Sequence, residues 1–166
     1  LASILFTACA DDNNQRATRY DLSEEAIEDK FRVYVDRFVE EAAIRGIDID
    51  ISELTVTEGI DPNFQEFCGY GYPNYNGTGE PRIEINEEPF CWDDRTDIQR
   101  EALMFHELGH AILSRPHRED RYPSTLPVSM MCSAACTGNN LFLVYNNYTP
   151  ELREYYLDEL FEPLVS

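Results

Sequence analysis

The chain has 166 residues and a mass of 19.2 kDa, and 43% of its residues are hydrophobic, which suits one domain with one core. Its 32 acidic and 13 basic residues give a net charge of −19. This charge argues against nucleic-acid binding, because phosphate would be repelled, and no polybasic segment is present to bind anionic lipid. The acidity is typical of a solvated surface, although a preference for cationic substrates would also fit it. We expect a monomer.

The N-terminus resembles the end of a bacterial lipoprotein signal peptide. An apolar run over residues 1–6, too short to span a bilayer, leads into Cys9, and acidic and amide residues follow. The resemblance implies a signal remnant at 1–8, lipidation of Cys9, a polar tether at 9–21 and a folded domain at 22–166. The protein would then be exported and lipid-anchored to a bacterial membrane, at the outer membrane or the cell surface. A buried N-terminal strand with an incidental cysteine is the alternative.

Apolar residues at helical spacing predict a long helix after the tether. Ser23 is suited to cap its start, and Gly46 is suited to its end. The apolar positions are Ile27, Phe31, Tyr34, Val35 and Phe38. We expect this helix to lie behind a small sheet.

Extended segments are predicted next. Residues 49–57 alternate loosely and end in a β-prone run, and a second extended piece surrounds 67–72. The Gly-, Tyr- and Asn-rich stretch 69–79 is typical of a loop. Polar and apolar residues alternate strictly over Arg82–Asn86, which predicts a half-buried strand.

Four cysteines remain when Cys9 is set aside. An even number in an exported chain favours two disulfides. We predict one between Cys68 and Cys91 and one between Cys132 and Cys136, because the second pair is close in sequence, although four cysteines allow three pairings. A structural zinc held by cysteines is the alternative, and the chain lacks the paired C-x-x-C that would favour it.

A second helix is predicted from Thr96, which forms a capping box with Gln99. Its core-facing stripe consists of Ile98, Ala102, Phe105, Gly109 and Ile112. Gly109 has no side chain, so the helix could approach a neighbour closely there. Pro116 disfavours helical conformation at the residue before it, so we expect the helix to end near Ser114.

All three histidines of the chain lie at the end of this helix, in the pattern H-E-x-x-H followed by a third histidine. His106 and His110 are one helical turn apart and can bind one zinc ion, with Glu107 between them as general base. Catalytic zinc normally has three protein ligands. His117 can be the third only if the chain folds back, since a continuous helix would carry it about 10 Å further along the axis. A downstream glutamate as third ligand is the alternative.

These residues resemble the zinc motif of the metzincin metallopeptidases, H-E-x-x-H-x-x-G-x-x-H. The spacing here is one residue longer, as in archaemetzincin-like proteins, and Ser114 stands where those proteins usually have glycine. The cysteine pattern of archaemetzincins is absent downstream. The resemblance implies an α+β fold of the zincin type: one catalytic domain with a small mixed sheet, a backing helix, an active-site helix, a Met-turn and a C-terminal helix. It also implies that the strand at Arg82–Asn86 is an antiparallel edge that pairs with substrate, with an ordinary solvent-facing edge as the alternative.

The segment Pro127–Cys132 resembles the Met-turn that follows the zinc motif in this clan. Its methionine packs beneath the metal site, and Met131 fits the pattern better than Met130. Two ordinary core methionines are the alternative. A last helix is predicted to open at Thr149–Pro150, with Leu152, Tyr156 and Leu160 on one face.

The sequence therefore predicts a zinc-dependent endopeptidase that acts on peptide or protein substrates. Zinc would acidify a water molecule, and Glu107 would take its proton during attack on the scissile carbonyl. No fourth histidine is present to stabilise the oxyanion, so zinc itself would carry most of that charge, with Tyr145 or Tyr148 as candidates to assist it. The alternative is a non-catalytic, surface-tethered lipoprotein with a structural zinc. In that case a fourth protein ligand, such as Asp120 or Cys132, would complete the coordination of the ion.

Overall fold

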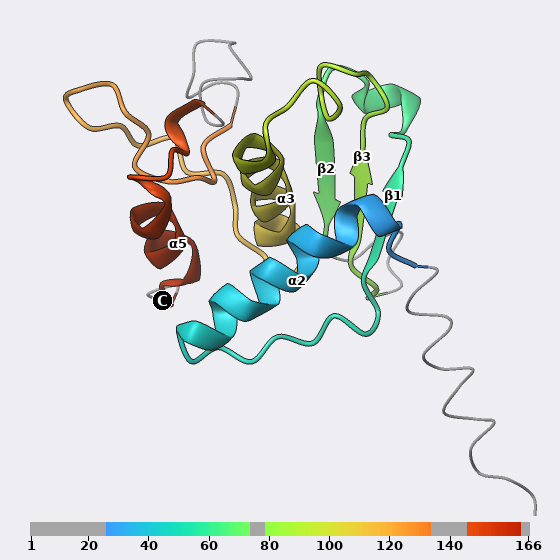
Figure 1. Cartoon of the computed structure of the whole chain (residues 1–166), viewed down its shortest axis with the longest axis horizontal. Coiled ribbons are helices and arrows are strands. Elements are labelled where there is room, and N and C mark those ends of the chain that lie inside the picture. Colours follow the sequence, from blue (N-terminus) through green and yellow to red (C-terminus); the bar gives the residue numbers. More distant parts are fainter. Residues whose placement is uncertain (1–25, 74–78, 134–145, 164–166) are drawn as a thin grey trace, which may run out of the picture.

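The computed structural model describes residues 26–73, 79–133 and 146–163. In this part of the chain, the helices α2, α3 and α5 and a three-stranded sheet make a small α+β domain, which confirms the predicted class (Figure 1). The elements are α2 (Asp29–Ile44), β1 (Thr55–Glu58), the short 3-10 helix η1 (Pro62–Phe64), β2 (Gly69–Tyr72), β3 (Arg82–Ile85), α3 (Asp97–Ala111) and α5 (Arg153–Phe161). Within these residues no helix is both long and apolar enough to cross a bilayer.

The sheet is mixed, with the strand order β1–β3–β2. β1 is parallel to β3, and β2 is antiparallel to it. The strand predicted at Arg82–Asn86 is therefore present, but the expectation that it is an edge is wrong, since it has a partner on each side. The antiparallel edge of the described sheet is β2. The extended piece predicted around 67–72 is confirmed as β2, so the loop predicted over 69–79 is wrong at its start.

The first helix begins later than predicted. Ser23 lies outside the described residues, and α2 begins at Asp29, because the chain just before it pairs with β1. Ile27 forms a parallel bridge with Val56, whose N–H donates to the carbonyl of Ala26 at 2.8 Å. The predicted end is confirmed: Gly46 has φ +76°, the left-handed conformation that glycine adopts at low cost.

Two other boundaries also differ from the sequence prediction. β1 begins only at Thr55, because the chain turns before it, with the N–H of Leu54 donating to the carbonyl of Ile51. α5 begins at Arg153 rather than at Thr149–Pro150, and the N–H of Leu152 donates to the carbonyl of Thr149 in a preceding turn. Local turns thus replace the outer ends of both predicted elements.

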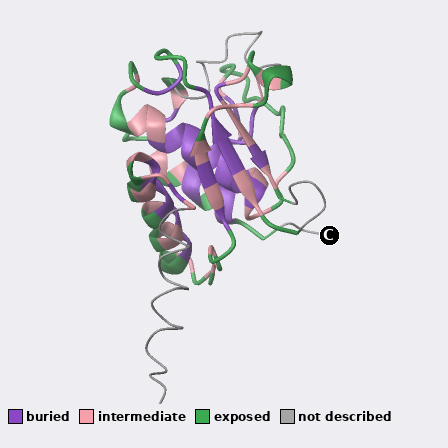
Figure 2. Cartoon of the chain, turned by 90° about the vertical axis from the view of Figure 1, so that its right-hand side faces the viewer, coloured by how far each residue is buried: buried purple, intermediate pink, exposed green. Residues whose placement is uncertain are grey.

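The core surrounds α3, which lies between the sheet and α5 (Figure 1). Buried residues are concentrated where the sheet meets this helix (Figure 2). Phe38 of α2 packs edge-on against Phe105 of α3, with ring centroids 5.2 Å apart, and its ring also lies 5.0 Å from that of Phe161 in α5. The predicted capping box begins α3, since the N–H of Thr96 donates to Gln99 Oε1 at 3.1 Å. The helix is therefore held on several sides.

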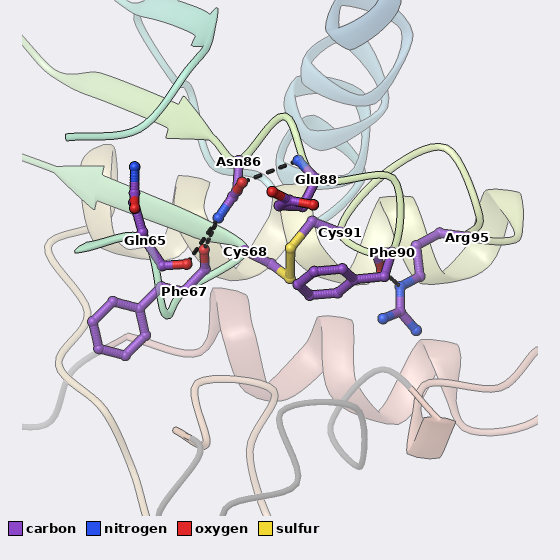
Figure 3. Close-up of a disulfide and its surroundings, with 8 residues drawn as sticks. All are labelled: Gln65, Phe67, Cys68, Asn86, Glu88, Phe90, Cys91 and Arg95. Carbon is purple, nitrogen blue, oxygen red and sulfur yellow. Dashed lines mark hydrogen bonds between the residues drawn. A yellow bond between two sulfur atoms is a disulfide. The ribbon is translucent and has the colours of Figure 1, made fainter. Parts of the chain in front are cut away.

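A disulfide joins Cys68, just before β2, to Cys91 in the loop that precedes α3 (Figure 3). This confirms the predicted pairing and excludes both residues as metal ligands. Beside it, the side-chain nitrogen Nδ2 of Asn86 donates to the backbone carbonyls of Gln65 and Phe67 at 3.1 and 2.9 Å. The start of β2 is thus anchored both covalently and through Asn86. The pairing of Cys132 with Cys136 stays a prediction, since Cys136 lies outside the described residues.

Candidate metal centre

The three histidines converge at the end of α3. His106 and His110 lie one turn apart on the helix, and the chain folds back to bring His117 beside them. Ring centroids are 4.9 Å apart for His106 and His110, 5.4 Å for His106 and His117, and 4.6 Å for His110 and His117. One ligand nitrogen from each lies within 4.8 Å of the others. The arrangement could hold a metal ion, as the sequence predicted.

The reversal between the second and third histidines is tighter than predicted. The helix α3 ends at Ala111, earlier than the predicted end near Ser114. Ser114 has φ +52°, in the left-handed region where glycine is favoured. The N–H of Arg115 then donates back to the carbonyl of Gly109 at 2.9 Å. Serine therefore occupies the conformation for which the resembled proteins usually carry glycine.

Backbone carbonyls orient the first two imidazoles. His106 Nδ1 lies 2.7 Å from the carbonyl oxygen of Met130, and His110 Nδ1 lies 2.6 Å from that of Arg115. A carbonyl can only accept, so each Nδ1 carries the proton and each Nε2 is left with its lone pair for a metal. Burial lowers the pKa of His106 to about 3 and also lowers the pKa of His110. Both rings are therefore neutral at neutral pH, as metal binding requires.

Glu107 is buried between α3 and β2. The backbone N–H of Gly71 donates a hydrogen bond to its carboxyl group, but burial dominates and raises the pKa of Glu107 to about 8. A Cβ on Gly69 would lie 2.9 Å from Glu107 Cγ, and a Cβ on Gly71 would lie 2.4 Å from the Glu107 carbonyl oxygen. Only glycine fits at either position while α3 lies this close to β2.

Gly69 and Gly71 are the site residues that sequence reasoning missed. Their signal was present, because two glycines at alternate positions in a tyrosine-rich run put all the bulk on one face of a strand. A loop was predicted from the glycine content alone. The alternation indicates instead a strand with another element packed closely against its glycine face.

The two neighbouring methionines make different contacts. Both are buried, and a Cβ on Gly109 would lie 2.5 Å from Met131 Sδ, which is the close approach predicted for this glycine. The carbonyl of Met130 holds His106, while the N–H of Met131 donates to Ser129 Oγ at 2.9 Å. The side chain of Met131 thus packs against α3, whereas Met130 acts through its backbone.

Other predicted site residues lie elsewhere. Tyr148 is buried and donates to Glu101 Oε1 at 2.7 Å, so its hydroxyl is already engaged in the core and the oxyanion role considered for it is not supported. Asp120 accepts from Arg118 Nε at 3.0 Å and is not part of the histidine group. Neither is Cys132, and no carboxylate belongs to that group in the described part of the chain. Cys9 and Tyr145 lie outside the described residues.

Comparison of the chain with family models, with curated proteins and with solved structures finds no match. Three converging imidazoles, two of which keep Nε2 for a metal because a carbonyl holds Nδ1, form a donor set that suits zinc, whose catalytic sites commonly have three protein ligands. The residues present fit such an ion.

Proposed function

We propose that the protein is a zinc-dependent endopeptidase whose ion is held by His106, His110 and His117. One observation carries this proposal: three converging imidazoles lack a fourth protein donor among the described residues, and Glu107, which follows the first of them on α3, has a buried carboxyl group. A structural zinc site is normally closed by four protein ligands, whereas a catalytic site keeps one position open. The open donor set therefore favours catalysis over the non-catalytic alternative.

Zinc, when bound, supplies a Lewis acid that acidifies water and polarises a carbonyl group. Glu107 is the only acid or base on α3 placed between the first two histidines, and its side chain faces β2. We assign it the proton transfers: it accepts a proton from the attacking water and returns it to the leaving amine. The raised pKa of Glu107 shows how strongly its pocket disfavours the charged form, and a nearby cation would oppose that effect.

The edge strand β2 offers a place for the substrate backbone. The N–H of Asn86 donates to the carbonyl of Cys68 at 2.9 Å, which makes these two residues a hydrogen-bonded pair of the antiparallel ladder. Because such pairs alternate, Gly69 and Gly71 direct their N–H and C=O groups away from β3. This agrees with the hydrogen bond from Gly71 to Glu107. An extended peptide that pairs with this edge would lie next to the proposed base.

The decisive experiment compares two variants in a peptide-library digest, with zinc and with a chelator. Glu107→Gln should retain stoichiometric zinc and lose about 10²- to 10⁴-fold in kcat/KM, because it keeps the size of the side chain but cannot accept a proton. His110→Ala should lose both metal and activity. Glu53→Gln, which changes an exposed glutamate before β1, is the matched control and should behave as the wild type. Undiminished turnover by Glu107→Gln would refute the assigned base.

The membrane tether belongs to the same proposal. We assign lipidation to Cys9 on the pattern of the N-terminal residues alone, which places the catalytic domain outside the cytoplasm on a lipid anchor. Mass spectrometry of the full-length protein from its own host should show acyl chains on Cys9. An unmodified cysteine there would remove the anchor from the proposal without affecting the metal site.

A further inference from the structure

The turn between His110 and His117 is held from outside by the C-terminal helix. This turn carries an unfavourable left-handed residue, Ser114, so its own conformational preference does not maintain it. The next residue, Arg115, accepts a hydrogen bond from His110 Nδ1 on its carbonyl oxygen, at 2.6 Å. The direction of that carbonyl therefore decides how the second imidazole is turned.

The side chain of Arg115 extends to the end of α5. Its Nη2 donates to the carbonyl of Leu160 at 2.6 Å and to that of Glu159 at 3.4 Å, and it also contacts the carbonyl of Glu162. These carbonyls lie at the C-terminal end of α5, where most carbonyls lack an intrahelical partner and the dipole favours a positive charge. One arginine thus satisfies the end of α5 and supports the metal turn.

We propose that Arg115 is a positioning residue for the metal, through which α5 sets the affinity of the site. The guanidinium group anchors the turn to α5, the backbone carbonyl of the same residue orients His110, and the anchored turn presents His117. The inference rests on the proposed metal site and assigns a role that the zinc motif does not contain, since the side chain of Arg115 has no contact of its own with the histidine rings among its hydrogen bonds.

Arg45 provides a matched control. It also binds α5, through Glu154 at 3.1 Å and Asp158 at 2.9 Å, but it does so from the end of α2. Arg45→Ala therefore removes an arginine that docks the same helix and leaves the metal turn intact. A general loosening of α5 would affect both alanine variants, whereas positioning of the metal depends on Arg115 alone.

The test measures the zinc dissociation constant by competition with a chromophoric chelator, together with the visible spectrum of the Co²⁺-loaded protein. Arg115→Ala should bind zinc about 10- to 100-fold more weakly than the wild type, the range found when groups that orient metal ligands are removed, and its Co²⁺ spectrum should change. Arg115→Lys, which keeps a cation for the α5 carbonyls, should recover part of the affinity. Arg45→Ala should match the wild type in both measurements.

Two results would overturn the inference: unchanged affinity in Arg115→Ala, or an equal loss in Arg45→Ala. If Arg115→Ala does not fold by circular dichroism, Arg115→Gln, which keeps a polar side chain but removes the charge, takes its place, and wild-type affinity with an unchanged Co²⁺ spectrum in that variant would overturn the inference. Failure of the wild-type protein to bind zinc would instead refute the proposed function. The two failures are therefore distinguishable in one series of titrations.

Discussion

The two sides of the metal centre are held by different forces. His106 and Glu107 lie on a helix buried by aromatic and aliphatic packing, whereas His117 is exposed and lies on a segment linked to the rest by polar contacts. The N–H of Arg118, for example, donates to the carbonyl of Met131 at 2.9 Å. The helix side is therefore formed by the core before any metal binds, while the turn side gains the most from binding one.

The largest effect is expected from a substitution on the helix side of the metal centre. Phe105 is fully buried against Phe38, so Phe105→Ala should lower the free energy of unfolding by about 3–5 kcal/mol in metal-free buffer. Leu113→Ala, in the half-buried start of the turn, should cost clearly less. Urea unfolding of both variants measures the difference. Equal losses would mean that the turn is as much a part of the core as the helix.

Metal addition should act on the turn side. Zinc at about 1,000 times its dissociation constant should raise the free energy of unfolding of the wild type by about 4 kcal/mol. His117→Ala should lose most of this gain, yet its metal-free stability should stay within about 0.5 kcal/mol of the wild type, because His117 is exposed. Thermal or urea unfolding with zinc and with chelator measures both. If His117→Ala lost much of its stability in the absence of metal, the turn side would contribute to folding before metal binds, contrary to this expectation.

Acidity should affect the helix side of the metal-free protein in two opposite ways. The pKa of Glu107 is raised from 4.5 to about 8 by burial, so the folded state holds its proton more tightly, and stability is lost as pH rises through that window. The pKa of His106 is lowered from 6.5 to about 3, so stability is lost as pH falls through that window.

Unfolding in chelator at several pH values tests this expectation. Between pH 5 and 8, Glu107→Gln should remove the loss that accompanies rising pH, a difference of more than about 1 kcal/mol at pH 8 relative to the wild type. The loss that follows acidification below pH 6.5 should remain, because His106 is unchanged in this variant. Parallel pH profiles for the two proteins would contradict the assigned burial of Glu107.

The smallest expected effect concerns the strained residue of the turn. Ser114→Gly should stabilise the protein by less than about 1 kcal/mol, because glycine adopts φ +52° without the steric cost that serine carries, although it loses more entropy on folding. Ser124→Gly changes an exposed serine of the same segment and should not stabilise it. A destabilising Ser114→Gly would show that the serine side chain contributes to the turn.

Much of the site was predictable from local pattern. The spacing of His106 and His110 places both on one helical face wherever that helix lies, and Pro116 indicated that the helix would end before His117. The capping box at Thr96 and the glycine end of α2 are also local features, and both are present. The pairing of Cys68 with Cys91 was one of three possibilities, and only the spatial neighbourhood of β2 and α3 selected it.

Local turns account for the late starts of β1 and α5, whereas the wrong predictions about the sheet and the site concern partners that are distant in sequence. The strand at Arg82–Asn86 was expected at an edge, but β1 and β2 flank it, and strand order depends on long-range pairing. Residues 69–72 were covered both by a predicted extended piece and by a predicted loop, and the close packing of α3 against Gly69 and Gly71 favours the strand. Tyr148 was considered for the metal site, but the buried carboxylate of Glu101 binds its hydroxyl.

The sequence by itself determined which atoms are available for chemistry: three imidazoles and one carboxyl group within twelve consecutive residues. Spacing along one helix is a property of the backbone, so it needs no tertiary information. Only the tertiary structure decided how those atoms are oriented, because the groups that orient them are carbonyls at Met130 and Arg115 and a strand edge at Gly71. Backbone groups of this kind are present at nearly every residue, so the sequence does not mark which of them will orient the site, and only the fold decides it.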